Sequence, residues 1–127
     1  MSEFKFKIKG YHLPNTDKDG SDPYFKMKVG GDKIYKSKHE KNTCSPSWDS
    51  FKVKRSKFGA HPLLADVEIE IYDHDFGKDD YMCTAIFKIG RVLEHGDNEM
   101  KVDCFNEKKN IKGERCGYIS VTCYLDD

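Results

Sequence analysis

The 127-residue sequence predicts an all-β fold, an antiparallel β-sandwich formed by a single domain over residues 1–127. Three observations support this prediction. Apolar and polar residues alternate with a period of two, clusters of turn residues separate the alternating runs, and no long amphipathic helix interrupts them. The alternating runs cover residues 4–9, 25–29, 51–54, 67–72 and 119–124. Each run has one apolar and one polar face, as expected where an antiparallel sheet buries one side.

The first two runs carry lysines on their polar faces. Residues 4–9 alternate phenylalanine or isoleucine with lysine, and residues 25–29 alternate phenylalanine, methionine and valine with lysine. Gly30, Gly31 and Asp32 follow the second run and predict a hairpin, because glycine readily adopts the positive φ angles of tight turns. A strand is therefore expected on each side of this turn.

The later runs complete the predicted sandwich. Phe51 and Val53 alternate with lysines, and residues 67–72 alternate valine or isoleucine with glutamate or tyrosine. Residues 92–95 predict only a brief helical turn, and residues 119–124 predict the closing strand. The sequence has no internal repeat and no low-complexity linker, which is consistent with one domain.

Charge is balanced in total but segregated along the chain. The 22 Lys and Arg residues equal the 22 Asp and Glu residues, so the formal net charge is zero. Lysines crowd residues 26–57, whereas acidic residues crowd two loops and the C-terminus. Local fields should therefore influence the choice of partner more than the net charge does.

Composition also argues against several classes of protein. No apolar run approaches the roughly 20 residues that a membrane-spanning helix needs, and the N-terminal residues lack the apolar segment of a signal peptide. The five cysteines show no CxxC spacing, which indicates free thiols in a reducing compartment and predicts a cytoplasmic protein. The lysines are not interleaved with aromatic residues as in nucleic-acid-binding motifs, so no nucleic acid partner is expected.

Two aspartate-rich segments give the strongest functional signal. Residues 17–22 read Asp-Lys-Asp-Gly-Ser-Asp, residues 73–80 read Asp-His-Asp-Phe-Gly-Lys-Asp-Asp, and each follows a predicted strand. Carboxylates this crowded repel one another unless a cation lies among them, and Ca²⁺ takes about six to eight oxygen ligands from flexible loops of this kind. If folding brings the two segments together, they form a calcium site.

Three other interpretations of these segments are weaker. An EF-hand loop would begin at Asn15 and would need a bidentate glutamate where Lys26 stands. Solvated turns would explain either segment alone, since Asp and Gly are ordinary turn residues, but they explain two such segments less well. A hydrolytic metal site or acid–base pair usually needs placed histidines or a nucleophile, and no HxxxH or G-x-S-x-G pattern is present, so no enzyme is expected.

The ordered motifs of the chain resemble those of the C2 domain family. Residues 13–26 contain Leu-Pro, then Asp17, then Gly-Ser-Asp-Pro-Tyr-Phe-Lys, similar to the first calcium loop and the following strand of the family. Residues 42–51 resemble the family's Asn-Pro-x-Trp segment, residues 67–82 resemble the strand and third calcium loop, and residues 117–121 resemble the closing strand. The resemblance implies an eight-stranded C2-like Greek-key sandwich, of the circularly permuted type II topology, with all calcium loops at one end.

The resemblance also implies a set of metal ligands. The family's calcium ligands map onto Asp22, Asp73 and Asp75, with Asp17 and Asp80 as further ligands. Both loops are one residue shorter than the common family pattern. Asp19 is therefore an alternative to Asp17, and Asp79 is an alternative to Asp80. The predicted metal site also includes the loop residues His74 and Lys18.

Membrane targeting is the function that the resemblance implies. Ca²⁺ bound at an acidic tip would reverse the local field and offer open coordination positions to anionic phospholipids such as phosphatidylserine. Phe76, at the apex of the third loop, is predicted to insert among lipid headgroups, with packing against its own loop as the alternative. The protein would then move from the cytoplasm to the cytosolic face of membranes when calcium rises.

A second lipid contact is predicted on the lysine-rich strands. Exposed lysines near a membrane contribute about 1 kcal/mol each against anionic lipid, and the family often uses this strand pair for phosphoinositides. The alternative is an ordinary solvated surface. The residues concerned are Lys26, Lys28, Lys36 and Lys38.

A competing hypothesis for the whole chain is a protein-interaction domain of the same fold, with a weak or structural calcium site and a protein partner or a further domain in a longer chain.

Overall fold

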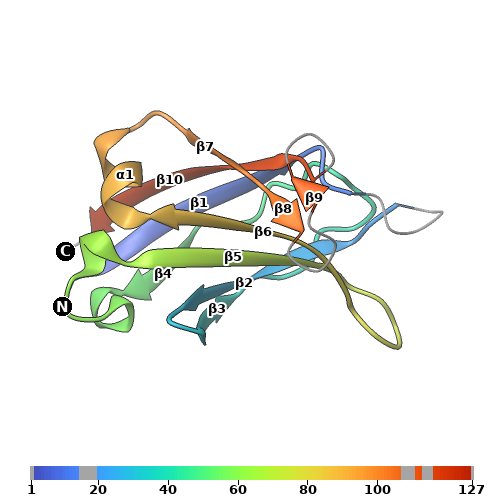
Figure 1. Ribbon diagram of the computed structural model, residues 1–127, viewed down its shortest axis with the longest axis horizontal. Coiled ribbons are helices and arrows are strands. Elements are labelled where there is room, and N and C mark those ends of the chain that lie inside the picture. Colours follow the sequence, from blue (N-terminus) through green and yellow to red (C-terminus); the bar gives the residue numbers. More distant parts are fainter. Residues whose placement is uncertain (1, 15–19, 107–110, 113–115, 127) are drawn as a thin grey trace.

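Two antiparallel β-sheets pack face to face in the computed structural model, which describes residues 2–14, 20–106, 111–112 and 116–126 (Figure 1). The first sheet has the strand order β4-β1-β10-β7, and the second has the order β3-β2-β5-β6-β8-β9. This arrangement confirms the predicted all-β sandwich. The strands of the first sheet are β1 (Glu3–Tyr11), β4 (Phe51–Lys54), β7 (Met100–Asp103) and β10 (Tyr118–Asp126). Those of the second are β2 (Pro23–Val29), β3 (Asp32–Lys36), β5 (Asp66–Asp73), β6 (Asp80–Lys88), β8 (Phe105–Asn106) and β9 (Ile111–Lys112).

All five alternating runs of the sequence lie in strands, within β1, β2, β4, β5 and β10. The predicted number of strands was wrong, because ten strand segments rather than eight occur among the described residues. Eight of the ten have four or more residues, whereas β8 and β9 have two residues each and pair at the edge of the second sheet. Two-residue strands are too short to produce a recognisable alternation.

Short helical segments connect the strands at one end of the sandwich. Two 3₁₀ turns, η1 (Arg55–Phe58) and η2 (Pro62–Leu64), follow β4, and the helix α1 (Ile89–Glu94) follows β6. The helical turn expected at residues 92–95 is therefore present but begins earlier. It does so because Ile89 and Val92, three residues apart on the helix, both reach the core.

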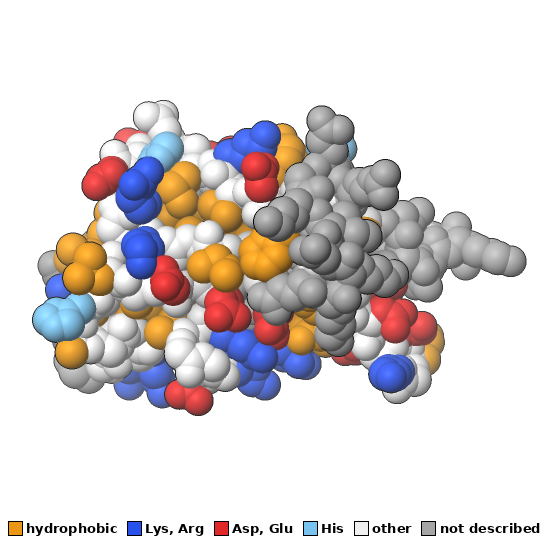
Figure 2. Space-filling view, viewed as in Figure 1, with side chains coloured by type: hydrophobic (Ala, Val, Ile, Leu, Met, Phe, Trp, Pro, Cys, Tyr) orange, Lys and Arg blue, Asp and Glu red, His pale blue; other side chains and the backbone are white. Residues whose placement is uncertain are grey.

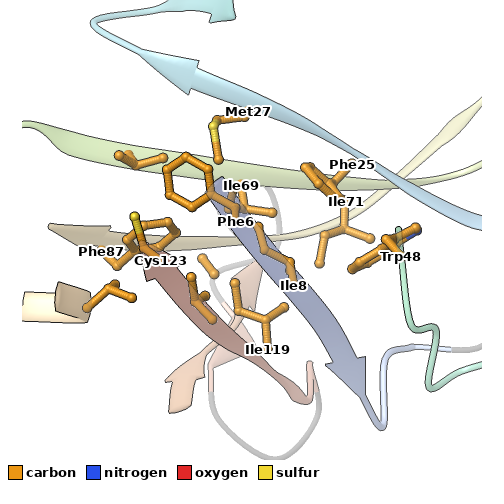
Figure 3. Close-up of a cluster of buried hydrophobic side chains, with 14 of the residues drawn as sticks. Phe6, Ile8, Phe25, Met27, Trp48, Ile69, Ile71, Phe87, Ile119 and Cys123 are labelled. Carbon is orange, nitrogen blue, oxygen red and sulfur yellow. The ribbon is translucent and has the colours of Figure 1, made fainter. Parts of the chain in front are cut away.

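The apolar faces of the two sheets form one core between them. Side chains from β1, β2, β5 and β10 meet there, with Trp48 closing the core near the loops (Figure 3). Phe6 is fully buried and stacks on Phe51 with a centroid separation of 5.4 Å. Fully burying a side chain of this size stabilises a fold by about 1.5–3 kcal/mol. The alternation in β1 thus fixes which face of the first sheet turns inward.

The strand pairing places the aspartate loops and the chain ends at opposite ends of the sandwich. β1 and β10 pair over their whole length, from Glu3 opposite Asp126 to Tyr11 opposite Tyr118. The chain ends therefore lie side by side, while the segments that follow Tyr11 and precede Tyr118 lie at the far end (Figure 1). The β5–β6 connection lies at that same far end and extends beyond the body of the sandwich (Figure 1).

Candidate metal site at the loop tip

Three connections form the tip. The first loop (residues 12–22) joins β1 to β2, the middle loop (residues 37–50) joins β3 to β4, and the third loop (residues 74–79) joins β5 to β6. β2 and β5 are antiparallel neighbours, with Pro23 opposite Asp73. This register alone places the end of the first loop beside the beginning of the third.

Asp22 and Asp73 are in direct contact at this junction. The backbone N–H of Asp22 donates to Oδ1 of Asp73 at 2.8 Å, and the backbone N–H of His74 donates to the carbonyl of Asp22 at 2.9 Å. Asp73 is fully buried. Burial of a carboxylate is costly unless hydrogen bonds or a cation compensate for the lost water. The sequence prediction that folding joins the two aspartate segments is met at this pair of residues.

The middle loop closes over the same junction. The backbone N–H of Asn42 donates to Oδ1 of Asp22 at 2.8 Å, and the backbone N–H of Thr43 donates to the carbonyl of Ser21 at 2.8 Å. Asn42 has a φ of 51°, in the left-handed region that asparagine tolerates better than most residues. Its side-chain oxygen lies 1.9 Å from where a Cβ on Gly20 would stand, so only glycine fits at that position. Sequence reasoning assigned Asn42 no role, although its position in the resemblance motif was a usable signal.

The third loop is organised by Asp79. Its Oδ2 accepts a hydrogen bond from the hydroxyl of Tyr24 at 2.5 Å, and its Oδ1 accepts one from the backbone N–H of Asp75 at 3.1 Å. Nδ1 of His74 lies 3.6 Å from the same Oδ1. The bond from Tyr24 is the main cause that holds the pKa of Asp79 below its usual value, while burial and this bond raise the pKa of Tyr24. Tyr24 therefore stays protonated and Asp79 stays anionic at neutral pH.

Asp75 and Asp80 complete the described acidic residues of the tip. Oδ1 of Asp75 accepts the backbone N–H of Phe76 at 2.7 Å, and Asp80 begins β6 directly opposite Asp73. Both carboxylates are exposed. Asp79 and Asp80 are alternative ligands from the sequence analysis. Each oxygen of Asp79 already accepts a hydrogen bond, so among the described contacts the carboxylate of Asp80 has fewer partners.

The predicted metal residues are thus brought to one end, with two exceptions. Asp17 and Lys18 lie outside the described residues, as does Asp19, so their predicted roles remain predictions. Within the described part of the chain, no group of three or more His, Cys, Asp or Glu side chains is close enough to hold a metal ion. The donors at the junction of Asp22 and Asp73 are nevertheless hard carboxylate and carbonyl oxygens, the chemistry that Ca²⁺ prefers.

The four predicted lipid-binding lysines occupy two different environments. Lys28 forms an ion pair with Glu70 at 2.9 Å, and Lys26 lies over the ring of Tyr72 at 4.5 Å from its centroid, so both are half-buried against β5. Lys36 and Lys38 are exposed beside the tip. Figure 2 shows blue side chains along the lower edge of the molecule, where β2 and β3 lie in Figure 1, with red acidic side chains among them.

Phe76 is fully exposed at the third loop, with a relative exposure of 104%. The alternative that it packs against its own loop is therefore not realised.

A family comparison decides the class of this sandwich. The C2 domain model matches residues 6–105, which include the strands on both sides of the first and third loops. The chain belongs to the C2 domain family.

Other C2-containing proteins are similar to this chain. Copine-D of Dictyostelium discoideum is 30% identical over 106 residues, covering 82% of this chain and 20% of the copine. Multiple C2 and transmembrane domain-containing protein 2 of Mus musculus is 33% identical over 92 residues, covering 68% of this chain and 10% of that protein. The chain therefore spans a fifth or less of the length of these relatives.

Solved C2 structures share the fold. The structure of C2 domain A of plant extended synaptotagmin 1 superposes with a TM-score of 0.74 at 19% identity, covering 98% of this chain and 94% of that one. A calcium-bound structure of C2 domains A and B of extended synaptotagmin 2 superposes with a TM-score of 0.70 at 20% identity, covering 98% of this chain and 45% of that one. The matches indicate no catalytic family. None of the helices in the described part of this C2 domain has the length and apolar character to span a bilayer.

Proposed function

We propose that this C2 domain binds Ca²⁺ at its tip and, through the ion, anionic phospholipid membranes. The observation that supports the proposal best is the contact between Asp22 and the fully buried Asp73, which joins the two aspartate-rich loops at one end of the sandwich. Asp75 from the third loop, Asp80 at the start of β6 and Asp17 from the first loop would add further oxygen ligands. Asp79, Lys18 and His74 remain secondary candidates in the same two loops.

The chain's own residues prepare the tip for such a contact. Asn42 and His74 fix the position of Asp22 through backbone hydrogen bonds, and the bond from Tyr24 holds Asp79 in place. A bound Ca²⁺ would supply positive charge and open coordination positions for phosphate or carboxylate oxygens of lipids such as phosphatidylserine. The exposed ring of Phe76 would enter the headgroup region beside the bound ion.

This function needs no catalytic group, and we infer a membrane-targeting module rather than an enzyme. Recruitment from the cytoplasm to the cytosolic face of a membrane as calcium rises follows from the same electrostatics, because an acidic tip without the ion repels anionic lipid. The C2 fold of the relatives and the calcium-bound state of one structural neighbour support the proposal.

Vesicle sedimentation with Asp73→Asn tests the proposal. The parent protein should sediment with phosphatidylserine vesicles in Ca²⁺ and remain in solution with a chelator, whereas Asp73→Asn should not respond to Ca²⁺. The amide oxygen of asparagine can still accept the N–H of Asp22, so the change removes charge with little change of shape. Asp32→Asn is the matched control, since Asp32 is an exposed residue at the start of β3, next to the β2–β3 turn.

The competing function is a protein-interaction domain with a weak or structural calcium site. The observation that favours it is the lack of a three-donor metal group among the described residues. Sedimentation of the parent that is equal in Ca²⁺ and chelator would support this second function. Unchanged calorimetric affinity of Asp73→Asn for Ca²⁺ would reject the ligand assignment.

A further inference from the structure

A cavity of about 450 Å³ lies at the end of the sandwich that carries the two chain ends, opposite the loop tip (Figure 1). Its walls come from the start of the chain and from the segment that follows β4, and these stretches meet because Glu3 lies opposite Lys54. The volume is within the range of about 300–1,000 Å³ that ligand pockets occupy. None of the described residues that line it is acidic. We call it the basal cavity; its lining includes Ser2, Lys54, Arg55, Ser56 and Pro62.

The segment that forms the basal cavity is anchored to the core. Phe58, at the end of η1, is only 2% exposed, and its ring meets that of Phe4 edge-on at a centroid separation of 5.4 Å. The backbone N–H of Arg55 donates to the carbonyl of Ser2 at 3.2 Å and so ties the two walls together. The cavity is therefore formed before a partner arrives, which lowers the entropy cost of binding one.

The cations of the basal cavity are not neutralised by neighbouring carboxylates. Lys54 and Arg55 line it, Lys57 follows in η1, and none of the three forms an ion pair within 4.0 Å among the described residues. By contrast Lys52, on β4, and Lys88, at the end of β6, are each paired with an aspartate. An acidic partner would therefore meet three cations without displacing an existing ion pair.

Exposed leucines border these cations. Leu63 and Leu64, in η2, are 45% and 70% exposed, and the same turn contributes Pro62 to the cavity lining. The turn packs closely on α1, since a Cβ on Gly90 would stand 2.9 Å from the carbonyl oxygen of Leu63. Figure 2 shows hydrophobic side chains exposed at the end where Figure 1 places the chain termini. This end thus offers apolar contact and positive charge together.

The third loop, at the opposite end, has the complementary features. Residues 73–80 carry four aspartates against one lysine, and the fully exposed ring of Phe76 lies among them. Asp75, directly before Phe76, and Asp80, four residues after it, are exposed. The loop extends beyond the body of the sandwich (Figure 1), so a concave surface on another molecule can enclose it.

We propose that the third loop of one copy of this chain docks into the basal cavity of a second copy. The ring of Phe76 would cover the apolar side chains of η2, while the aspartates beside it face Lys54 and Arg55, whose guanidinium can hold a carboxylate with two hydrogen bonds. A molecule cannot place its own loop in its own cavity, because the two lie at opposite ends of β1. The contact therefore joins different surfaces of two copies, head to tail.

This docking and membrane binding would exclude one another. The proposed membrane contact uses the same ring of Phe76, which is covered when the loop occupies a basal cavity. A contact made by one loop is small, and small interfaces belong to weak, transient complexes. Self-association would thus hold the loop only while no membrane competes for it.

Sedimentation velocity in the presence of a chelator tests the docking. The average mass of the parent should rise from micromolar to millimolar concentrations, and Phe76→Ala should weaken this association by about tenfold or more. Lys54→Gln/Arg55→Gln should weaken it by about tenfold, because two charge pairs are lost. Lys52→Gln/Lys88→Gln is the matched control, since it removes the same charge from the same end and should change the association by less than about threefold. Thermal melts verify that each variant is folded.

A mixture of two defective variants separates docking from general aggregation. Phe76→Ala keeps an intact cavity, and Lys54→Gln/Arg55→Gln keeps an intact loop, so an equimolar mixture should form a one-to-one complex with the affinity of the parent. In a dilution series of the parent, ¹⁵N–¹H amide signals of residues 54–64 and 74–79 should shift together, while those of residues 100–103 stay constant.

Three results would overturn the inference. They are a parent that stays monomeric at millimolar concentration in chelator, a mixture of the two variants that associates no better than either alone, and equal losses in the cavity variant and its lysine control. Failure of calcium-dependent sedimentation with phosphatidylserine vesicles would reject only the proposed function of the tip, because the docking is measured without Ca²⁺.

Discussion

Tyr24 is the residue that links the third loop to the second sheet. Its hydroxyl donates to Asp79 in the third loop, while its ring lies under the ammonium of Lys36. It also stacks on Tyr72 at a centroid separation of 5.6 Å, so its position is fixed by the sheet rather than by the loop. The loop carboxylate is thus oriented by a side chain that belongs to the rigid body of the sandwich.

Replacing Tyr24 by phenylalanine should raise the pKa of Asp79. The hydroxyl stabilises the ionised carboxylate and is the main cause that lowers this pKa from its ordinary value of 3.8. Because the folded-state pKa is the lower one, the stabilisation is complete above about pH 4 and is lost as the pH falls through the folded-state value. Carboxyl ¹³C NMR titration in chelator measures the shift directly.

The control for this experiment is Tyr72→Phe. Tyr72 is a neighbouring stacked tyrosine, but its hydroxyl donates to Glu70 at 3.0 Å and not to Asp79. Removal of the Tyr72 hydroxyl should therefore leave the pKa of Asp79 unchanged. Equal effects of the two substitutions would show that ring packing, and not the hydroxyl, controls the carboxylate.

At the scale of elements, β5 and β6 determine how far the third loop projects. The two strands pair from Asp66 opposite Lys88 to Asp73 opposite Asp80, with an irregularity between Ile71 and Tyr72. Residues 74–79 lie beyond the last pair and so have no strand partner to cover them. Phe76 is exposed for this reason rather than through a failure of packing in the core.

Phe76→Ala should shorten the residence time of the protein on phosphatidylserine vesicles in Ca²⁺ by about tenfold or more. An inserted phenylalanine removes apolar surface from water, which is worth about 1.5–3 kcal/mol when burial is complete. Leu64→Ala is the control, because Leu64 is 70% exposed in η2, near the chain ends and away from the tip. Stopped-flow dissociation measures both variants, and equal residence times of parent and Phe76→Ala would contradict insertion.

Gly117 directly precedes β10 at the tip end of the sandwich and tolerates no side chain. Its φ is 70°, and a Cβ there would lie 2.2 Å from the carbonyl oxygen of Tyr11 and 2.5 Å from that of His12. Gly117→Ala should therefore destabilise the fold by about 2–4 kcal/mol, more than the cost of a positive φ alone. Gly96→Ala separates the two effects, since Gly96 has a φ of 57° with nothing within 4 Å of its Cβ position. Urea denaturation measures both, and equal losses would show that the close contact adds nothing.

The strands that the sequence predicts best are those whose sequences alternate apolar and polar residues, including β10, where Ser120 and Thr122 keep the alternation although residues 119–123 are all buried. β6 escapes prediction because both of its faces are covered at residues 82–85 and its sequence Met-Cys-Thr-Ala-Ile-Phe over residues 82–87 does not alternate. The joining of Asp22 and Asp73 could be predicted, since each ends or begins a recognisable strand. The role of Tyr24 could not, because it depends on a contact across 55 residues that no local pattern encodes.

At the scale of the whole molecule, a net charge of zero conceals a strong separation of charge. Acidic side chains gather at the tip, while lysines lie on the outer faces of β2 and β3 beside it. Like charges held together in the folded state oppose folding, and a ligand that binds only the folded state removes this penalty.

Millimolar Ca²⁺ should therefore raise the melting temperature, and Mg²⁺ should raise it much less. Mg²⁺ demands octahedral geometry and gives up its water reluctantly, whereas Ca²⁺ accepts irregular oxygen sets. Differential scanning calorimetry of the parent and of Asp73→Asn measures the shift, which the substitution should abolish. Equal shifts with both ions, or none with either, would contradict a specific site.

The pairing of β1 with β10 gives the molecule a mechanical direction. Glu3 lies opposite Asp126, so a force that pulls the two chain ends apart would act first on this pair. The β1–β10 ladder would then open one residue pair at a time. A force between a membrane held at the tip and either chain end would instead run along the strands and load nine paired positions together in shear. Nine strand residues span about 30 Å. We therefore expect the sandwich to resist a force along its strands better than a force that separates its two chain ends.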